Sequence, residues 1–193
     1  MKLKLFLTVL LLIGSKLFAQ DSKVSLELNY PIATDNNFFG KNYNGIIDVG
    51  VDFKFLDLNA ITIGAALNAG VFTNNSNNEF QTFKVTSYVI QPRMVGELDI
   101  ETISRLHPSV GIGYTIMVFD GTGVNNINGL DVLGANDTQS GFNLNFGIAY
   151  DISKRLFAKV QYDFVKLNVD NRIPDIKFNT NVNILKIGLG YRL

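Results

Sequence analysis

The feature that most constrains this chain is a two-residue alternation of apolar and polar side chains, repeated in eight segments. Clusters of Asn, Asp and Gly separate these segments, and only residues 98–107 favour a short turn of helix. This pattern predicts an all-β chain, because alternate side chains of a strand point to opposite faces of its sheet. We expect strands at 24–32, 46–56, 60–72, 83–98, 108–119, 141–151, 156–167 and 182–193.

The connections between these segments alternate in length. The first, third, fifth and seventh are long and polar, and they span 33–45, 73–82, 120–140 and 168–181. The second and sixth are tight, and the fourth is intermediate. In an up-and-down antiparallel sheet, this alternation places every long loop at one end and every short turn at the other. The strands also have the length of about 9–11 residues with which a tilted strand crosses a membrane.

The composition of the polar face indicates which face points inward. This face is rich in Gly, Asn, Thr and Ala, which suits a crowded interior, and its charges balance in sign, as desolvated charges must. The apolar face is bulky in every strand, and tyrosines stand near strand ends, where interfacial aromatic residues lie. We therefore predict an eight-stranded antiparallel up-and-down transmembrane β-barrel. Its interior charge network would contain Glu27, Asp48, Asp52, Glu97 and Asp163 with Lys54, Arg93, Lys159, Lys186 and Arg192.

The first nineteen residues read as a cleaved secretory signal. Lys2 and Lys4 precede an apolar core at 5–13, and cleavage is expected after Ala19. The apolar run is about half of the ~20 residues that a membrane-spanning helix needs. We expect a signal peptide at 1–19 and a single barrel domain at 20–193. Lys and Arg together equal Asp and Glu at 17 each, so no nucleic-acid partner is expected.

The final strand carries a recognisable pattern of residues. Lys186, Gly188, Tyr191 and Leu193 resemble the C-terminal signal of bacterial outer-membrane β-barrels, although Phe is commoner than Leu at the last position. Together with the signal sequence and the loop pattern, they make the chain similar to the small OmpA- and OmpX-like barrels. The resemblance implies an outer membrane of the Gram-negative type, contact with its lipid, recognition by the barrel-assembly machinery, and pairing of the last strand with the first.

Residues that suggest chemistry are sparse. His107, the only histidine, is interpreted as a solvent-facing residue of the intermediate fourth connection, expected on the periplasmic side, because nothing in the sequence predicts a partner that would orient it for catalysis. The absence of cysteine excludes disulfides and thiolate metal sites. We expect no catalytic residue, cofactor or metal. Pro92 lies within a predicted strand, and we expect a local bulge there because proline cannot donate to the ladder.

The predicted function is a structural, adhesive or surface-interaction role, exerted through the long loops, with an interior filled by side chains. Three alternatives stay open. One is a narrow pore of low conductance, and another is a membrane barrel that modifies lipids and depends on His107. The third is a secreted, lipocalin-like barrel that binds a small apolar ligand, in which the apolar face would line a cavity with Ile47, Val51, Phe53, Leu144, Phe146 and Leu189.

Overall fold

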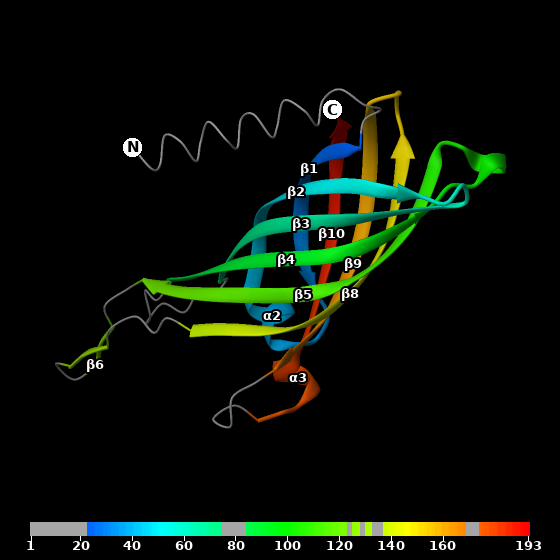
Figure 1. Cartoon of the computed structure of the whole chain (residues 1–193). Helices are drawn as coiled ribbons and strands as arrows, with labels where there is room; N and C mark the ends of the chain where they lie inside the picture. Colours follow the sequence, from blue (N-terminus) through cyan, green and yellow to red (C-terminus); the bar gives the residue numbers. More distant parts are fainter. Residues whose placement is uncertain (1–22, 75–83, 123–124, 128–129, 133–136, 169–173) are drawn as a thin grey trace, which may run out of the picture.

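The computed structural model describes residues 23–74, 84–122, 125–127, 130–132, 137–168 and 174–193, so the expected signal peptide lies outside the described residues. Eight antiparallel strands form a closed barrel in which every strand pairs with its neighbour along the chain and the last pairs with the first (Figure 1). These strands are β1 (Val24–Thr34), β2 (Tyr43–Asp57), β3 (Ile61–Asn74), β4 (Lys84–Leu98), β5 (Leu106–Thr122), β8 (Asp137–Asp151), β9 (Leu156–Asn168) and β10 (Asn181–Arg192).

The predicted all-β, up-and-down architecture is confirmed. All eight strands lie where the alternation predicts them, and most extend by a few residues into the long connections. The third long connection contains a small additional hairpin of β6 (Asn125–Ile127) and β7 (Leu130–Val132). At the short-turn end, β5 begins at Leu106, so His107 belongs to the strand and not to the preceding connection.

Closure of the barrel depends on β1 and β10. Leu28 pairs with Leu189 in an unbroken antiparallel register that runs from Ser25 to Thr34. Beyond the end of β10, the backbone N–H of Leu193 donates to the carbonyl of Val24 over 3.0 Å. The terminal strand is therefore hydrogen-bonded on both sides, to β1 and to β9. This closure leaves the barrel sheet without an unpaired edge strand.

The alternation separates two faces as expected. Apolar side chains point outward and stay exposed, as with Leu28 at 57% and Phe146 at 54%, whereas Asn68, Asn143 and Asp163 on the inner face are fully buried. This is the arrangement of a barrel with a lipid-facing outer surface. It does not fit the lipocalin-like alternative, because the residues which that alternative places around a cavity lie on the outer face: Ile47, Val51, Phe53, Leu144, Phe146 and Leu189.

The predicted bulge at Pro92 is wrong. Pro92 pairs with Leu67 of β3 in an unshifted register, and on its other side the pairs from Ile90 and Arg93 to β5 keep the same alignment. Proline has a backbone φ that is compatible with an extended strand, so it removes one donor without needing an extra residue. The shifts in register lie in β2 instead, between Gly45 and Ile47 and between Lys54 and Leu56.

In the part of the chain that the structure describes, three short helical segments lie in the connections. They are α2 (Phe38–Asn42), the 3₁₀ turn η1 (Glu101–Ile103), which falls within the predicted helical turn, and α3 (Lys177–Thr180). Asn37 begins α2 by accepting a hydrogen bond from the N–H of Gly40 over 2.6 Å. Among the described residues, no helix is long and apolar enough to cross a membrane.

Candidate functional site: the barrel lumen

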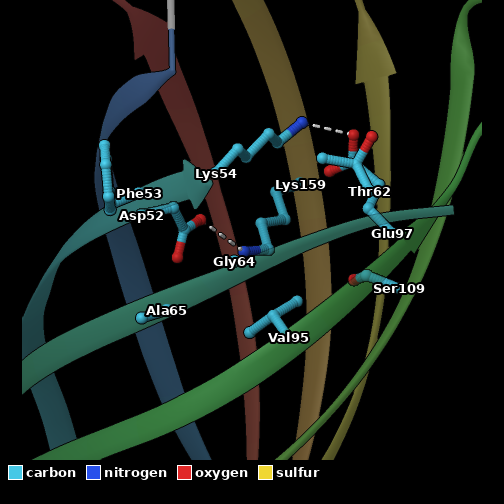
Figure 2. A pocket seen from close by; sticks show the side chains of 10 residues that line it. All are labelled: Asp52, Phe53, Lys54, Thr62, Gly64, Ala65, Val95, Glu97, Ser109 and Lys159. Carbon is cyan, nitrogen blue, oxygen red and sulfur yellow. Dashed lines mark hydrogen bonds and ion pairs between the residues drawn. The ribbon is translucent and has the colours of Figure 1, made fainter. Parts of the chain in front are cut away.

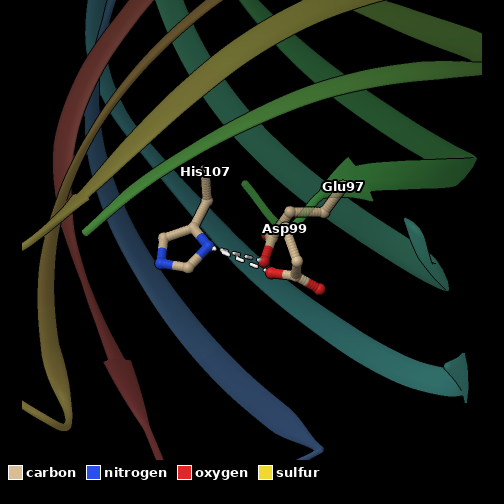
Figure 3. A group of neighbouring side chains, drawn as sticks. All are labelled: Glu97, Asp99 and His107. Atoms are coloured by element: carbon tan, nitrogen blue, oxygen red, sulfur yellow. Dashed lines mark hydrogen bonds and ion pairs between the residues drawn. The ribbon is translucent and has the colours of Figure 1, made fainter. Parts of the chain in front are cut away.

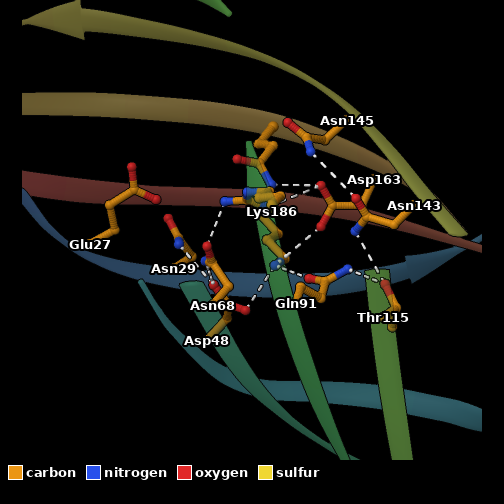
Figure 4. A network of polar contacts seen from close by, with 12 residues as sticks. Glu27, Asn29, Asp48, Asn68, Gln91, Thr115, Asn143, Asn145, Asp163 and Lys186 are labelled. Carbon is orange, nitrogen blue, oxygen red and sulfur yellow. Dashed lines mark hydrogen bonds and ion pairs between the residues drawn. The ribbon is translucent and has the colours of Figure 1, made fainter. Parts of the chain in front are cut away.

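Lys186 lies at the centre of the polar network that fills the middle of the barrel (Figure 4). It extends inward from β10, and its Nζ lies 2.8 Å from Asp48 Oδ2 of β2 and 3.1 Å from Asp163 Oδ2 of β9. The same ammonium donates to Gln91 Oε1 of β4 over 2.6 Å. Lys186 and Asp48 are almost wholly buried and Asp163 is fully buried, so each charge depends on its partners in place of water.

Amide side chains complete this middle layer. Asn29 and Asn68 donate to Asp48 Oδ1 over 2.9 and 2.6 Å, respectively. Arg93 donates from Nη2 to Asn68, and its Nη1 lies 3.7 Å from Asp163 Oδ1. These contacts join strands from opposite walls of the barrel, since β2, β4 and β9 all contribute charges. The layer therefore places buried, mutually paired side chains across the middle of the lumen (Figure 4).

A second charged group lies nearer the short-turn end. Lys159 of β9 donates to Glu27 Oε1 over 2.5 Å and lies 3.5 Å from Asp52 Oδ2. Lys54 forms an ion pair with Glu97 close to this group. Figure 2 shows Asp52, Lys54, Glu97 and Lys159 around a small recess at this end. Lys54 and Glu97 are 29% and 15% exposed, whereas Lys186, Asp48 and Asp163 are at most 2% exposed. This end of the lumen is therefore more accessible to solvent than the middle layer.

Apolar side chains close the other end of the lumen. Phe39 of α2 is 1% exposed; its ring stacks on Tyr43 with centroids 4.7 Å apart and meets the edge of Phe72 at 4.9 Å. We call this buried cluster the apolar plug. It consists of Phe39, Tyr43, Phe72, Val89, Met117, Phe119, Val165, Leu167, Val182 and Ile184.

The sequence did not lead us to predict the apolar plug, although a signal was present. Met117, Val165 and Leu167 occupy inward positions next to the long connections, where the inner face changes from polar to apolar. Phe39 has no comparable signal, because it lies in a connection whose sequence does not alternate. Helix α2 places it over the lumen, and burial of its ring contributes roughly 1.5–3 kcal/mol.

All ten residues of the predicted charge network lie on the inner face, but they form more than one group. Lys186, Asp48, Asp163 and Arg93 form the middle layer, while Lys159, Glu27 and Asp52 lie together nearer the short-turn end. Lys54 with Glu97 and Arg192 with Asp151 form two further pairs, and Arg192 Nη1 lies 2.7 Å from Asp151 Oδ1.

The interpretation of His107 as a solvent-facing residue is wrong. Its side chain is 14% exposed and points into the barrel at the short-turn end. Nδ1 lies 3.3 Å from Asp99 Oδ1, and Nε2 lies 3.1 Å from Asp151 Oδ2. The sequence pattern predicts a strand start at Pro108, which leaves His107 in the connection. The strand begins two residues earlier, and alternation then turns His107 inward together with Ser109.

The four residues of the C-terminal pattern have different surroundings. Lys186 lies in the middle layer, and Gly188 pairs with Asn29 on one side and Lys159 on the other. Tyr191 points outward, and its hydroxyl accepts a hydrogen bond from Arg155 over 3.2 Å. Leu193 follows the last residue of β10.

Solved structures of bacterial barrels share this fold. Neisserial surface protein A aligns with a TM-score of 0.58 at 13% identity over 88% of this chain and 96% of that one. Ail of Yersinia pestis, solved with the heparin analogue sucrose octasulfate, gives 0.57 at 10% identity over the same shares. The N-terminal barrel of Pseudomonas aeruginosa OprF gives 0.56 at 12% identity over 90% of this chain and all of that one.

At these identities, the structural similarity establishes the fold alone. The search of curated proteins gave no match. The model of the family described as outer membrane protein beta-barrel domain matches residues 5–192, nearly the whole sequence. The chain therefore belongs to the outer-membrane protein β-barrel domain family of bacteria.

Proposed function

We propose that the protein is a non-conducting barrel of the outer membrane that acts at the cell surface through its long-loop end. The observation that carries this proposal is the filled lumen. Lys186 with its carboxylate partners occupies the middle, and the apolar plug occupies the long-loop end. A solute path through both layers would need desolvated ion pairs to separate and buried aromatic rings to move. Long loops of such barrels face the outside of the cell.

An exposed apolar surface at the long-loop end supports a contact role. Phe38 of α2 and Phe178 of α3 meet edge to face with centroids 6.5 Å apart, and Lys41 Nζ lies 5.7 Å from the Phe178 ring centroid. Ile176 beside them is 52% exposed. We call Phe38, Lys41, Ile176 and Phe178 the loop-end patch. Exposed aromatic and apolar residues that gather in this way are typical of interaction sites.

Adhesion of bacteria that produce the protein tests this role. Cells with the wild-type chain should adhere to polystyrene, an apolar probe surface, more than cells without it. The double variant Phe38→Ser/Phe178→Ser should lose most of that gain. The control, Leu58→Ser/Ile152→Ser, removes two apolar residues that are even more exposed, from turns at the opposite end, and should adhere like wild type. Equal loss in both double variants would contradict a role for the loop-end patch.

The narrow-pore alternative is tested separately. Purified wild-type barrel in planar lipid bilayers should give no single-channel steps, because both layers of the lumen are closed. Reproducible steps from the wild-type protein would overturn the non-conducting part of the proposal. Such steps would not affect the proposed adhesion, because the loop-end patch lies outside the lumen.

A further inference from the structure

We propose that Glu97, Asp99 and His107 form a binding site for one divalent transition-metal cation, with Zn²⁺ as the best fit, at the short-turn end of the lumen. Glu97 lies near the end of β4, Asp99 follows this strand, and His107 lies at the start of β5. The connection that contains η1 folds back between them, and Glu97 pairs with Ser109 across the two strands. Figure 3 shows the three side chains converging from this hairpin.

The separations between the donor atoms match a metal centre. His107 Nδ1 lies 3.3 Å from Asp99 Oδ1 and 3.6 Å from Glu97 Oε1, and one ligand atom from each residue lies within 4.8 Å of the others. Zn²⁺ binds imidazole nitrogen and carboxylate oxygen at about 2.0–2.2 Å in tetrahedral geometry, which places ligand atoms roughly 3.3–3.6 Å apart. A cation bound here therefore takes the place of the Lys54 ammonium at Glu97 Oε1, and the two separations from His107 Nδ1 already have the length that Zn²⁺ needs.

Asp151, which is not one of the three ligands, orients the histidine. It comes from the end of β8, across the strand pair from β5, and its Oδ2 lies 3.1 Å from His107 Nε2. With the proton on Nε2 donated to Asp151, the lone pair of Nδ1 faces Glu97 and Asp99. A carboxylate that holds the second nitrogen of a ligand histidine is the usual outer partner of zinc sites.

A second outer contact orients Asp99. Thr62 Oγ1 of β3 donates to Asp99 Oδ2 over 2.8 Å, which leaves Oδ1 directed towards His107. The two outer contacts come from strands other than those that supply the ligands. These contacts hold His107 Nε2 and Asp99 Oδ2, so His107 Nδ1 and Asp99 Oδ1 are the atoms that face each other.

The local charge also favours a cation. Three carboxylates, Glu97, Asp99 and Asp151, surround His107, whereas the cations paired with them are Lys54 and Arg192. With a neutral imidazole, this leaves one excess negative charge. The recess lined by Glu97, Thr62 and Ser109 gives access from solvent. An imidazole ligand selects a transition metal over Mg²⁺ or Ca²⁺, which prefer oxygen ligands alone.

Titration of the folded barrel in detergent with Zn²⁺ alone, followed by calorimetry, tests the site. We expect one Zn²⁺ per chain, and Co²⁺ should give the visible absorption bands of a tetrahedral centre. His107→Ala should weaken the affinity for Zn²⁺ by at least about tenfold. Asp99→Asn provides a second ligand variant at the most exposed of the three positions, and folding of each variant is checked by the mobility shift on heating.

Further variants separate a metal site from structural damage. Lys54 competes for Glu97 Oε1, so Lys54→Met should tighten Zn²⁺ binding, a result that loss of structure cannot produce. Asp151→Asn should weaken binding by about 10–100-fold. Asp57→Asn, an exposed carboxylate at the same end, should change nothing. The proposal would be overturned if the wild-type barrel did not bind Zn²⁺, or if folded His107→Ala and Asp99→Asn bound it with the wild-type affinity.

Discussion

The ring of Phe157 fills the space that a side chain on Gly190 would occupy. The two residues are cross-strand partners on β9 and β10, and a Cβ on Gly190 would lie 2.0 Å from Phe157 Cζ. Phe157 is 4% exposed, and the guanidinium of Arg192 lies over its ring, 4.8 Å from the centroid. Glycine at 190 therefore lets an aromatic ring pack directly on the backbone of the terminal strand.

Substitution of this glycine should destabilise the barrel through overpacking. We expect Gly190→Ala to lower the free energy of unfolding by about 1–3 kcal/mol. The double variant Gly190→Ala/Phe157→Ala should be more stable than the sum of the two single changes predicts, because the clash is absent. Gly96→Ala is the control, since a Cβ there meets nothing closer than 3.9 Å. Urea unfolding, followed by heat-modifiable gel mobility, gives the free energy of unfolding of the two single variants, the double variant and the control. If the effects of Gly190→Ala and Phe157→Ala simply added up in the double variant, the packing relationship would be refuted.

Removal of the central cation should cost more than removal of a surface cation. Lys186→Met leaves Asp48 and Asp163 buried without their common partner, and we expect a loss of about 3–5 kcal/mol in the free energy of unfolding. Lys154→Met changes an exposed lysine in a turn and should stay within about 0.5 kcal/mol of wild type. The same urea titration compares them. Equal midpoints for the two variants would show that the middle layer contributes little to stability.

Replacement of two adjacent phenylalanines of α2 should lower the stability by very different amounts. Phe39→Ala removes a ring from the apolar plug and should cost about 3–5 kcal/mol. Phe38→Ala removes a ring that is 44% exposed and should have a much smaller effect on unfolding. Thermal unfolding in the same detergent makes the comparison. A larger effect at Phe38 would mean that α2 is not seated on the plug through Phe39.

The C-terminal pattern predicts a defect in assembly that differs from a defect in stability. We expect Tyr191→Ser to reduce the amount of folded barrel in the outer membrane of producing cells. Tyr150→Ser is the control, because Tyr150 is also outward-facing, lies at the same end and has nearly the same exposure, 47% against 43%. Immunoblots of unheated membrane samples report the folded fraction. Equal yields for the two variants would argue against a specific signal at Tyr191.

The barrel could be predicted from the sequence because polar inward residues alternate with apolar outward residues along each strand. Asn143 and Asn145 are inward and Leu144 between them is outward, and pairing of neighbouring strands follows from that parity. The identity of the interior charges could be read in the same way. The pairing of these charges could not be predicted, because Lys186 contacts Asp48 and Asp163 of other strands, and the stagger of those strands depends on closure of the barrel.

The features that were missed depend on local backbone geometry. Phe39 is buried because α2 turns it over the lumen, and a five-residue helix in a polar connection has no periodic pattern. Ile46 and Ile47 are both exposed because a bulge in β2 reverses the parity, and the sequence there reads as ordinary alternation broken by a single residue. The inward position of His107 was missed because β5 begins at Leu106, two residues before the predicted start at Pro108.

The middle layer separates the two ends of the lumen from each other. On the proposal that the barrel does not conduct, an ion that enters the recess lined by Lys159 and Glu97 meets Lys186 and its carboxylates and leaves by the same opening. Under the same proposal, His107 exchanges with the solvent at the short-turn end alone, so a cation bound there would report the composition of one compartment.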